Sequence, residues 1–225
     1  MSHDVRTPIN GIMGMLDIIR KNRQDEAKVD DCLDKINLSA SHLLALVNDV
    51  LDMNKLESGK ETIESASFDL KHLMDDVASL VNAQITEMGI THCTHRGELT
   101  HTRLIGSPLR LRQIMLNLFS NAIKYNKPGG MIDTYAGEVS CDGTRVVYEF
   151  RITDSGIGMS SEFIEKELFH PFTQEKSGAR TQYKGTGLGM SIVKELIEKM
   201  QGTIEVTSQQ GVGTTYVFRL PFYID

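Results

Sequence analysis

The sequence predicts an α+β protein in which an N-terminal antiparallel helical hairpin precedes an α/β sandwich. Two observations lead to this prediction. Over residues 5–50 apolar side chains recur every three or four positions, as they do in amphipathic helices. From residue 68 onward such helical patterns alternate with segments in which every second residue is apolar, as in strands. We therefore expect a hairpin domain over 1–60, a linker over 61–67 and a second domain over 68–225.

Composition sets limits on both parts. The chain has 225 residues, of which 40% are apolar and 24% charged, so a packed core needs no disulfide staples. The net charge of -6 argues against a nucleic-acid surface, which requires clustered lysine and arginine. Three cysteines without a CxxC pair indicate a reducing, cytoplasmic setting. We expect no membrane contact by this part of the protein, because neither a spanning segment nor a signal-peptide core is present.

The expected hairpin has one apolar stripe on each helix. The first stripe comprises Val5, Ile9, Ile12, Leu16 and Ile19, and the second comprises Leu33, Ile36, Ala40, Leu43, Val47 and Val50. The polar stretch Lys21 to Asp25 joins them. Two helices cannot bury both stripes by themselves, so we expect a homodimer with a four-helix bundle. The alternative is that the stripes pack on the rest of the same chain.

Two helices are expected early in the second domain. Asp69 can cap a helix whose apolar positions are Leu70, Leu73, Met74, Val77, Leu80 and Val81, with Gly89 as its stop. Ser107 and Pro108 open another by the usual cap-then-proline order. Its inward residues are Leu111, Ile114, Met115, Leu118 and Phe119.

Three segments read as strands. Their alternating apolar residues are Val146, Tyr148, Phe150 and Ile152, then Ile204 and Val206, then Tyr216, Phe218 and Leu220. The last two strands flank a turn at residues 209–211, which indicates a hairpin. We expect a mostly antiparallel sheet with helices on one face.

Asn117, Asn121 and Lys124 stand at i, i+4 and i+7 and so share one face of the second of these helices. Amide oxygens suit magnesium and an ammonium suits phosphate, so the row is typical of a metal-triphosphate site. The alternative is an ordinary solvated helix face.

Asp154 ends a predicted strand and precedes Gly156 and Gly158, which allow a turn that approaches a flat ligand. A carboxylate only accepts hydrogen bonds, so Asp154 can select adenine through its exocyclic amino group. An Asp-Ser-Gly turn without a ligand is the alternative.

A second glycine run, Gly185, Gly187 and Gly189, leads into a helix whose free amides can hold phosphate. The polar stretch from Glu175 to Lys184 before it is expected to form a mobile lid, anchored at its base by Phe169, Pro171 and Phe172. A glycine triplet alone is weak evidence, and no strand runs directly into it.

At the other end of the chain, His3 stands beside Asp4 in the run from Ser2 to Pro8. A histidine next to a carboxylate can accept a phosphoryl group. An acceptor and a triphosphate pocket in one chain together indicate a self-phosphorylating enzyme.

In this order and at this spacing, the motifs resemble the catalytic core of a sensor histidine kinase of a two-component system. The family's motifs match as follows: the H box at Ser2 to Pro8, the asparagine box at Leu111 to Tyr125, the glycine boxes at Asp154 to Met159 and Gly185 to Met190, and the phenylalanine box at Phe169 to Phe172. The resemblance covers nearly the whole chain. It implies a dimerisation and histidine-phosphotransfer domain followed by an ATP-binding domain of the gyrase, Hsp90, histidine kinase and MutL superfamily.

The resemblance also implies roles. His3 would take the γ-phosphoryl group of ATP, with Asp4 orienting its imidazole, and pass it to an aspartate of a response regulator receiver domain. Asn121 would hold magnesium, and Thr7 would position water to dephosphorylate the regulator. The remaining residues expected to bind nucleotide are Asn117, Lys124, Tyr125, Asp154, Gly156, Gly158, Lys184, Gly185, Thr186, Gly187, Leu188, Gly189 and Thr215.

Two other functions remain open at this point. One is a module that binds nucleotide and dimerises without turnover. The other is a hydrolytic ATPase, although relatives that hydrolyse ATP carry a glutamate where this chain has Asn117, and an amide cannot accept the proton of a water. The histidines and cysteine at 92, 93, 95 and 101 could suggest a metal site, but their pattern is more typical of strand edges and a loop, and we do not expect a metal there.

Overall fold

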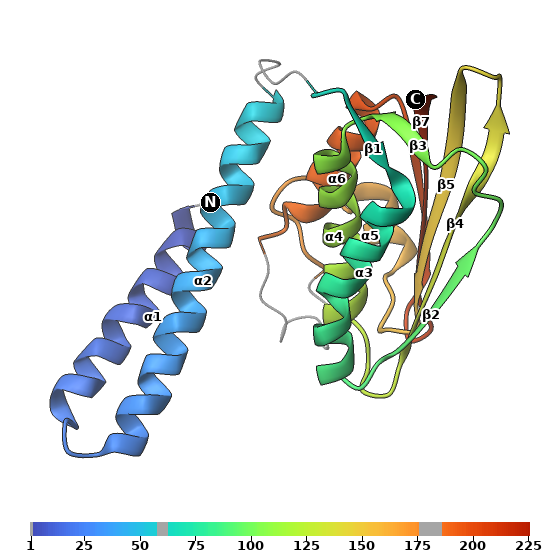
Figure 1. The fold of residues 1–225 in the computed structure, drawn as a ribbon. Coiled ribbons are helices and arrows are strands. Elements are labelled where there is room, and N and C mark those ends of the chain that lie inside the picture. The colour runs from blue at the N-terminus through green and yellow to red at the C-terminus, as the bar shows by residue number, and fades with distance from the viewer. Residues whose placement is uncertain (1, 58–62, 176–185) are drawn as a thin grey trace. The chain divides into compact units, whose positions relative to one another are not determined.

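The computed structural model describes residues 2–57, 63–175 and 186–225, without the side chains of residues 2–4, 42, 52 and 55–57. It divides into two compact units, Met1–Ser58 and Gly59–Asp225, each described below by itself (Figure 1). The family fold expected from the sequence, a helical hairpin followed by an α/β sandwich, is confirmed.

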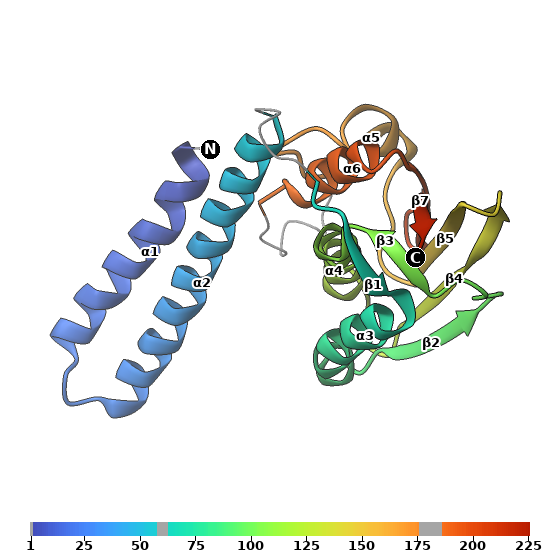
Figure 2. The same ribbon diagram turned by 45° about the horizontal axis from the view of Figure 1, so that its top comes forward.

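The first unit is a hairpin of α1 (Ser2–Lys21) and α2 (Glu26–Glu57), which run side by side (Figures 1 and 2). Polar side chains fix the turn between them. Asn22 Nδ2 donates to the carbonyl of Ile18 at 2.8 Å, and the Lys28 amide donates to Asp25 Oδ1 at 3.2 Å. Asp25 therefore satisfies one of the amides that every helix leaves free at its start.

Each helix carries two apolar stripes where the sequence predicted one: a shielded stripe and an exposed stripe. On α2 the more buried residues are Val29, Cys32, Ile36, Ser39, Leu43, Leu46 and Val50. The neighbouring residues Leu33, Ala40, Leu44, Val47 and Leu51 are exposed. On α1, Val5, Pro8, Ile12, Met15 and Ile19 are the shielded set, whereas Ile9, Met13 and Leu16 are exposed. One stripe on each helix joins the pair, and the other leaves apolar surface uncovered within this unit, because two helices bury only the faces that meet.

The second unit is built on a sheet. Its strands are β1 (Ala66–Asp69), β2 (Thr91–Arg96), β3 (Arg103–Gly106), β4 (Met131–Cys141), β5 (Arg145–Asp154), β6 (Thr203–Gln209) and β7 (Gly213–Ile224). The order is β1-β3-β7-β5-β4-β2, with β6 paired to β7. The β2–β4 pair is parallel and the other pairs are antiparallel. β1 begins at Ala66, within the predicted linker, because Ala66 and Ser67 continue the ladder with β3.

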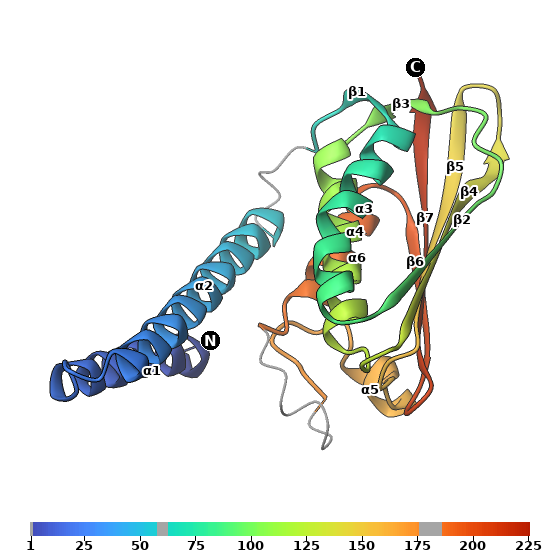
Figure 3. The same ribbon diagram turned by 60° about the horizontal axis from the view of Figure 1, so that its bottom comes forward.

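Helices α3 (Leu70–Glu87), α4 (Pro108–Lys124) and α6 (Gly189–Lys199) cover one face of this sheet, and the short α5 (Ser161–Lys166) lies at one end (Figure 3). The predicted caps are confirmed: Asp69 accepts from the His72 amide, Ser107 accepts from the Arg110 amide, and Gly89 follows α3 at φ +64°. Leu80 departs from the prediction. It lies on the solvent side of α3 and is 56% exposed, because the helix buries only one stripe.

The core lies between the helices and the inward residues of β5 and β7. Val146, Tyr148, Phe150 and Ile152 are all buried, as the alternation predicts, and Phe150 stacks on Phe218 with ring centroids 4.8 Å apart. The hairpin turn expected at residues 209–211 joins β6 to β7. Within the described ranges, none of the helices combines the length and apolar character needed to cross a membrane.

Candidate functional site

The site begins at the end of β5, where Asp154 is 6% exposed. Its Oδ1 accepts the amide of Gly156 at 2.9 Å and the amide of Thr214 at 3.3 Å. Two segments distant in sequence thus fix the carboxylate. A carboxylate buried among backbone donors is a fixed acceptor, and it suits a ligand that offers an N–H group.

The turn after Asp154 is pressed against the chain itself. A Cβ at Gly156 would stand 2.2 Å from the Tyr125 carbonyl oxygen, and one at Gly158, where φ is +64°, would stand 1.9 Å from the Gln209 carbonyl oxygen. The sequence assigned the need for glycine to a ligand. The close neighbours in the structure are instead carbonyl groups of the protein, and these leave no room for a side chain at either position.

This packing ties the turn to the end of α4. The Ile157 amide donates to the carbonyl of Tyr125 at 3.0 Å, while the Gly211 amide donates to the carbonyl of Ile157 at 2.8 Å. The turn is thereby held between α4 and the β6–β7 hairpin. The last turn of α4, where Asn121 and Lys124 lie, is adjacent to the Asp154 loop.

Asn117, Asn121 and Lys124 lie half-buried on α4, whereas Leu118, Ala122 and the other inward residues are buried. The ammonium of Lys124 lies 4.8 Å from the centre of the Tyr125 ring. In the described part of the chain, the side-chain amide of neither asparagine hydrogen-bonds to another residue. The row is therefore partly shielded from solvent and keeps its polar atoms available for a ligand.

Asn117 also lies beside the start of α6. Its Oδ1 would be 3.8 Å from a Cβ at Gly189. The residue before the helix, Leu188, supplies no side-chain cap, so the first amides of α6 are not satisfied by one. Such a helix start favours an anion.

Gly187 connects this region to the phenylalanine motif. The Phe172 amide donates to the Gly187 carbonyl at 3.0 Å, and both residues have positive φ. Thr186 Oγ1 accepts the Leu188 amide at 3.2 Å. Phe172 is 44% exposed and Pro171 is exposed, so backbone hydrogen bonding and not side-chain burial holds this segment. Lys184, Gly185 and the predicted lid after Glu175 lie outside the described residues.

The structure places Thr215 away from Asp154. In the β5–β7 ladder Asp154 stands opposite Thr214, and Thr153 stands opposite Thr215. Residues opposite each other share a face, and neighbours along a strand face opposite ways. Thr215 therefore lies on the face away from Asp154, where its hydroxyl is 3.1 Å from that of Thr153. The threonine beside Asp154 is Thr214, which is 4% exposed.

Sequence reasoning also missed a polar brace behind the site. Asn126 is 2% exposed, donates to the Met131 carbonyl at 3.1 Å, and accepts from the Ser155 hydroxyl at 3.3 Å. Ser208 Oγ accepts the Met159 amide at 2.8 Å and lies 2.9 Å from Thr214 Oγ1. Asn126 could have been suspected from its place directly after the α4 motif. No signal pointed to Ser208.

The phospho-acceptor motif is in the other unit. His3 and Asp4 belong to the first turn of α1, and their side chains lie outside what the structure describes. Thr7 is exposed one turn further along the helix. Since residues four apart lie on one helical face, Thr7 shares the face of His3.

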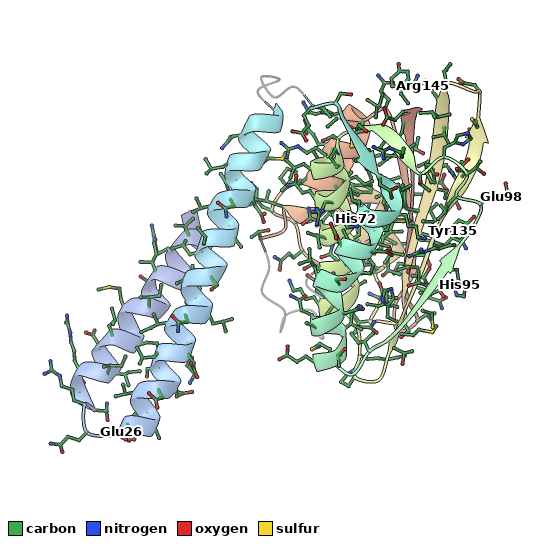
Figure 4. All side chains as sticks on the ribbon, viewed as in Figure 1. Glu26, His72, His95, Glu98, Tyr135 and Arg145 are labelled. Carbon is green, nitrogen blue, oxygen red and sulfur yellow. The ribbon has the colours of Figure 1, made fainter. Side chains whose placement is uncertain are left out.

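The histidines near residue 92 are separate from one another. His92 Nε2 lies 3.2 Å from Thr134 Oγ1, His95 Nε2 lies 2.9 Å from an Asp133 oxygen, and His101 Nδ1 lies 3.0 Å from a Glu138 oxygen. Each pairs with a different neighbour. Figure 4 shows His95 at the β2 edge of the sheet, and the part of the chain that the structure describes holds no group of three metal-ligating residues.

Comparison with known proteins identifies both units. The family of histidine kinase-, DNA gyrase B- and HSP90-like ATPases matches residues 106–224, and the His kinase A phospho-acceptor domain family matches residues 1–59.

Similar proteins extend beyond this chain. It is 38% identical to the hybrid signal transduction histidine kinase B of Dictyostelium discoideum and 35% identical to the autoinducer 2 sensor kinase/phosphatase LuxQ of Vibrio parahaemolyticus. Each match covers 98% of the chain but only 11% and 26% of those relatives. The crystal structure of full-length ShkA in complex with AMPPNP is similar at a TM-score of 0.72 and 29% identity, over 100% of this chain and 45% of that one.

Proposed function

Because this chain belongs to the sensor histidine kinase family, of which it contains the catalytic core, we propose that it transfers the γ-phosphoryl group of ATP to His3 and relays it to an aspartate of a receiver domain. Asp154 carries the nucleotide half of this proposal. Its carboxylate is buried, oriented by two backbone amides, and placed next to the helix that presents Asn117, Asn121 and Lys124. The phospho-acceptor half rests on the family match over residues 1–59.

The nucleotide pocket supplies recognition and charge. The fixed oxygen acceptor of Asp154 matches the exocyclic amino group of adenine, and guanine has a carbonyl at that position. Lys124 provides a positive charge for phosphate oxygens, and the uncapped start of α6 adds backbone amides. Phosphoryl transfer depends mainly on alignment and charge neutralisation, which these groups provide.

In the transfer step the γ-phosphorus exchanges one bond for another. A ring nitrogen of His3 attacks the γ-phosphorus and forms a P–N bond. The bond between the γ-phosphorus and its bridging oxygen breaks, and its electron pair leaves with ADP. Asp4 accepts a hydrogen bond from the other ring nitrogen and stabilises the positive charge that develops on the imidazole. A neutral ring presents one nucleophilic nitrogen, so the carboxylate also selects the tautomer.

Magnesium fits the residues present. Asn121 offers an amide oxygen, a hard donor that this ion accepts, and the rest of its shell would come from phosphate oxygens and water. When bound, the ion would neutralise charge on the triphosphate. Asn117 lies one turn before Asn121 and cannot act as a base toward water, so the site favours transfer over hydrolysis.

The partner is a receiver domain whose aspartate takes the group from His3. Thr7, exposed on the His3 face of α1, is suited to position a water that dephosphorylates the receiver. The LuxQ relative carries both kinase and phosphatase in its name. We place the chain in the cytoplasm, where ATP is available and thiols stay reduced, as part of a larger sensor that dimerises through the exposed stripes of the hairpin.

Incubation of the full chain with γ-labelled ATP tests the proposal. We expect acid-labile label on the protein, lost in His3→Gln and retained in His72→Gln, a matched change at an exposed histidine of α3. Free phosphate without labelled protein would instead indicate a hydrolytic ATPase. Nucleotide binding without either product would indicate a binding module. Label that persists in His3→Gln would contradict the assignment of the acceptor.

A further inference from the structure

The second unit contains a cavity that the nucleotide site does not use. It has a volume of about 170 Å³ and lies between helices α3 and α4 and strands β2, β4 and β5. Its apolar walls include Met74 and Ala78 of α3, Met115 and Phe119 of α4, and Phe150 and Ile152 of β5. Among the residues that the structure describes, none of those proposed to bind nucleotide lines it.

One corner of the cavity is polar. His92, Thr94 and Thr134 line it together, with His92 Nε2 at 3.2 Å from Thr134 Oγ1. The Thr134 hydroxyl also lies within hydrogen-bonding distance of the Cys93 carbonyl, at 3.2 Å. The His92 ring meets Phe119 edge-on, with centroids 5.8 Å apart. Burial lowers the pKa of His92, so near pH 7 the ring is neutral and has both a donor and an acceptor nitrogen.

The charges near the cavity are already matched. Arg96, which also lines it, pairs with Asp75 of α3 at 2.5 Å, and Arg151 pairs with Glu149 at 3.4 Å. A charged ligand would have to leave water without gaining a free counter-ion, which is costly. An uncharged ligand is therefore favoured.

Size selects the class of ligand. An apolar protein cavity of roughly 150 Å³ stays dry and accepts benzene. The cavity here is slightly larger, and the side chains of His92, Thr94 and Thr134 lie within hydrogen-bonding distance of one another in its wall. We propose that it binds a monocyclic aromatic molecule with one uncharged hydroxyl group, of the phenol class, with the ring among the methionine and phenylalanine side chains and the hydroxyl toward Thr134 and His92.

Helix α4 separates this cavity from the nucleotide site. Met115 and Phe119 line the cavity from one face of α4, whereas Asn117 and Asn121 belong to another face of the same helix. Ligand binding in the cavity does not depend on kinase activity, because the residues that line the cavity are not those proposed to bind nucleotide.

Methionine-methyl NMR of the full chain with phenol tests the proposal directly. We expect saturable shifts of the Met74 and Met115 methyl signals, which line the cavity, and no shift of Met190, which is buried in α6 away from it. Absence of saturable shifts at Met74 and Met115 overturns the proposal. Equal shifts at Met190 also overturn it, because they indicate non-specific binding.

Variants test the position and the polar corner. Ala78→Leu fills the cavity and is expected to abolish binding, whereas Ala83→Leu makes the same change on the exposed side of α3 and leaves binding unchanged. Thr134→Val removes the hydroxyl at constant shape. This variant should weaken phenol binding by about threefold to tenfold and leave toluene binding unaffected. Equal effects of Thr134→Val on the binding of phenol and of toluene would refute the assigned ligand class. Equal effects of the two leucine variants on phenol binding would refute the assigned site.

Discussion

Thr214 and Thr215 are adjacent and chemically identical, yet the structure gives them different surroundings. Thr214 stands opposite Asp154 and contacts Ser208, while Thr215 stands opposite Thr153 on the other face of the sheet. Successive strand residues face opposite ways, so a shift of one position in the assignment changes the face. Strand register therefore determines which threonine lies beside Asp154.

This difference gives a matched pair of variants. Thr214→Val should lower the free energy of unfolding by about 1–1.5 kcal/mol, because it removes the hydrogen bond between Ser208 and a Thr214 hydroxyl that belongs to a buried residue. It should also weaken AMPPNP binding, since the Thr214 side chain lies on the same face of the sheet as the Asp154 carboxylate. Thr215→Val should cost about 1 kcal/mol or less and leave binding intact. Urea unfolding and titration calorimetry measure both quantities, and equal effects of the two variants would contradict the placement.

A second residue-scale feature is the carboxylate of Glu138. Burial opposes its ionisation, but the backbone amide and ring of His101 and the hydroxyl of Tyr148, at 2.8 Å, outweigh burial and hold the pKa of Glu138 below its usual range. The pKa of the buried Tyr148 is raised, first by burial and then by Glu138. The cluster ties the loop before β3 to strand β4.

The sign of the pH effect follows from that lowered pKa. A depressed carboxyl contributes stability above its unfolded pKa of about 4.3 and loses it as pH falls through the lower, folded value. Glu138→Gln should therefore be less stable than the native chain at neutral pH, and the gap should narrow in acid. Urea unfolding across this range measures it. Glu87→Gln, at an exposed position of α3, is the control, and a gap that stays constant with pH would refute the prediction.

At the scale of elements, the two stripes on α2 separate two tasks. Cys32 and Leu46 are almost fully buried within the hairpin, whereas Leu33, Leu44, Val47 and Leu51 are between 42% and 62% exposed. Leu44, Val47 and Leu51 follow the three-and-four spacing of a coiled-coil seam. An apolar stripe with this period favours a second copy of the hairpin as its partner.

Substitution on this stripe tests the proposed dimer. Leu44→Glu should shift the chain toward monomer, because it places a charge within the apolar seam. Leu38→Glu is the matched control, since Leu38 is 74% exposed and belongs to neither stripe. Sedimentation velocity at several protein concentrations measures the distribution. A native chain that is monomeric throughout, or a Leu38→Glu variant that dissociates equally, would count against the seam.

The helices of the second unit follow their local signals closely. Ser107 and Pro108 begin α4, and Asp69 and Gly89 mark the ends of α3, because caps and stops act through neighbouring backbone groups. Leu80 shows the limit of pattern alone. It fits the helical period, but only tertiary packing decides how wide the buried stripe is.

For the whole molecule, the division into two compact units is the main feature. Leu46 belongs to the core of the hairpin and Leu118 to the core of the second unit, and both are almost fully buried. Separate cores favour separate unfolding transitions, because cooperativity requires shared contacts.

Core substitutions should therefore act on one unit at a time. Leu46→Ala and Leu118→Ala should each lower the free energy of unfolding of their own unit by about 2–5 kcal/mol. If the hairpin dimerises, the transition that Leu46→Ala shifts should depend on protein concentration. The transition that Leu118→Ala shifts should not. Differential scanning calorimetry resolves the transitions. A single transition that both variants shift equally would show that the units unfold together.

Four features could be predicted without the structure: the α+β class, the caps of α3 and α4, the turn between β6 and β7, and the motifs that place the chain in its family. These features depend on side-chain period and on neighbouring residues, which are present in the sequence directly. The positions of Asp154 beside the end of α4 and of the buried brace at Asn126 and Ser208 were decided only by tertiary structure. Strand register and long-range hydrogen bonds set them, and no local pattern encodes which distant segments meet. The same reason explains why Thr214, and not Thr215, lies beside Asp154, why one apolar stripe became two, and why the cavity behind α4 had no signal in the sequence.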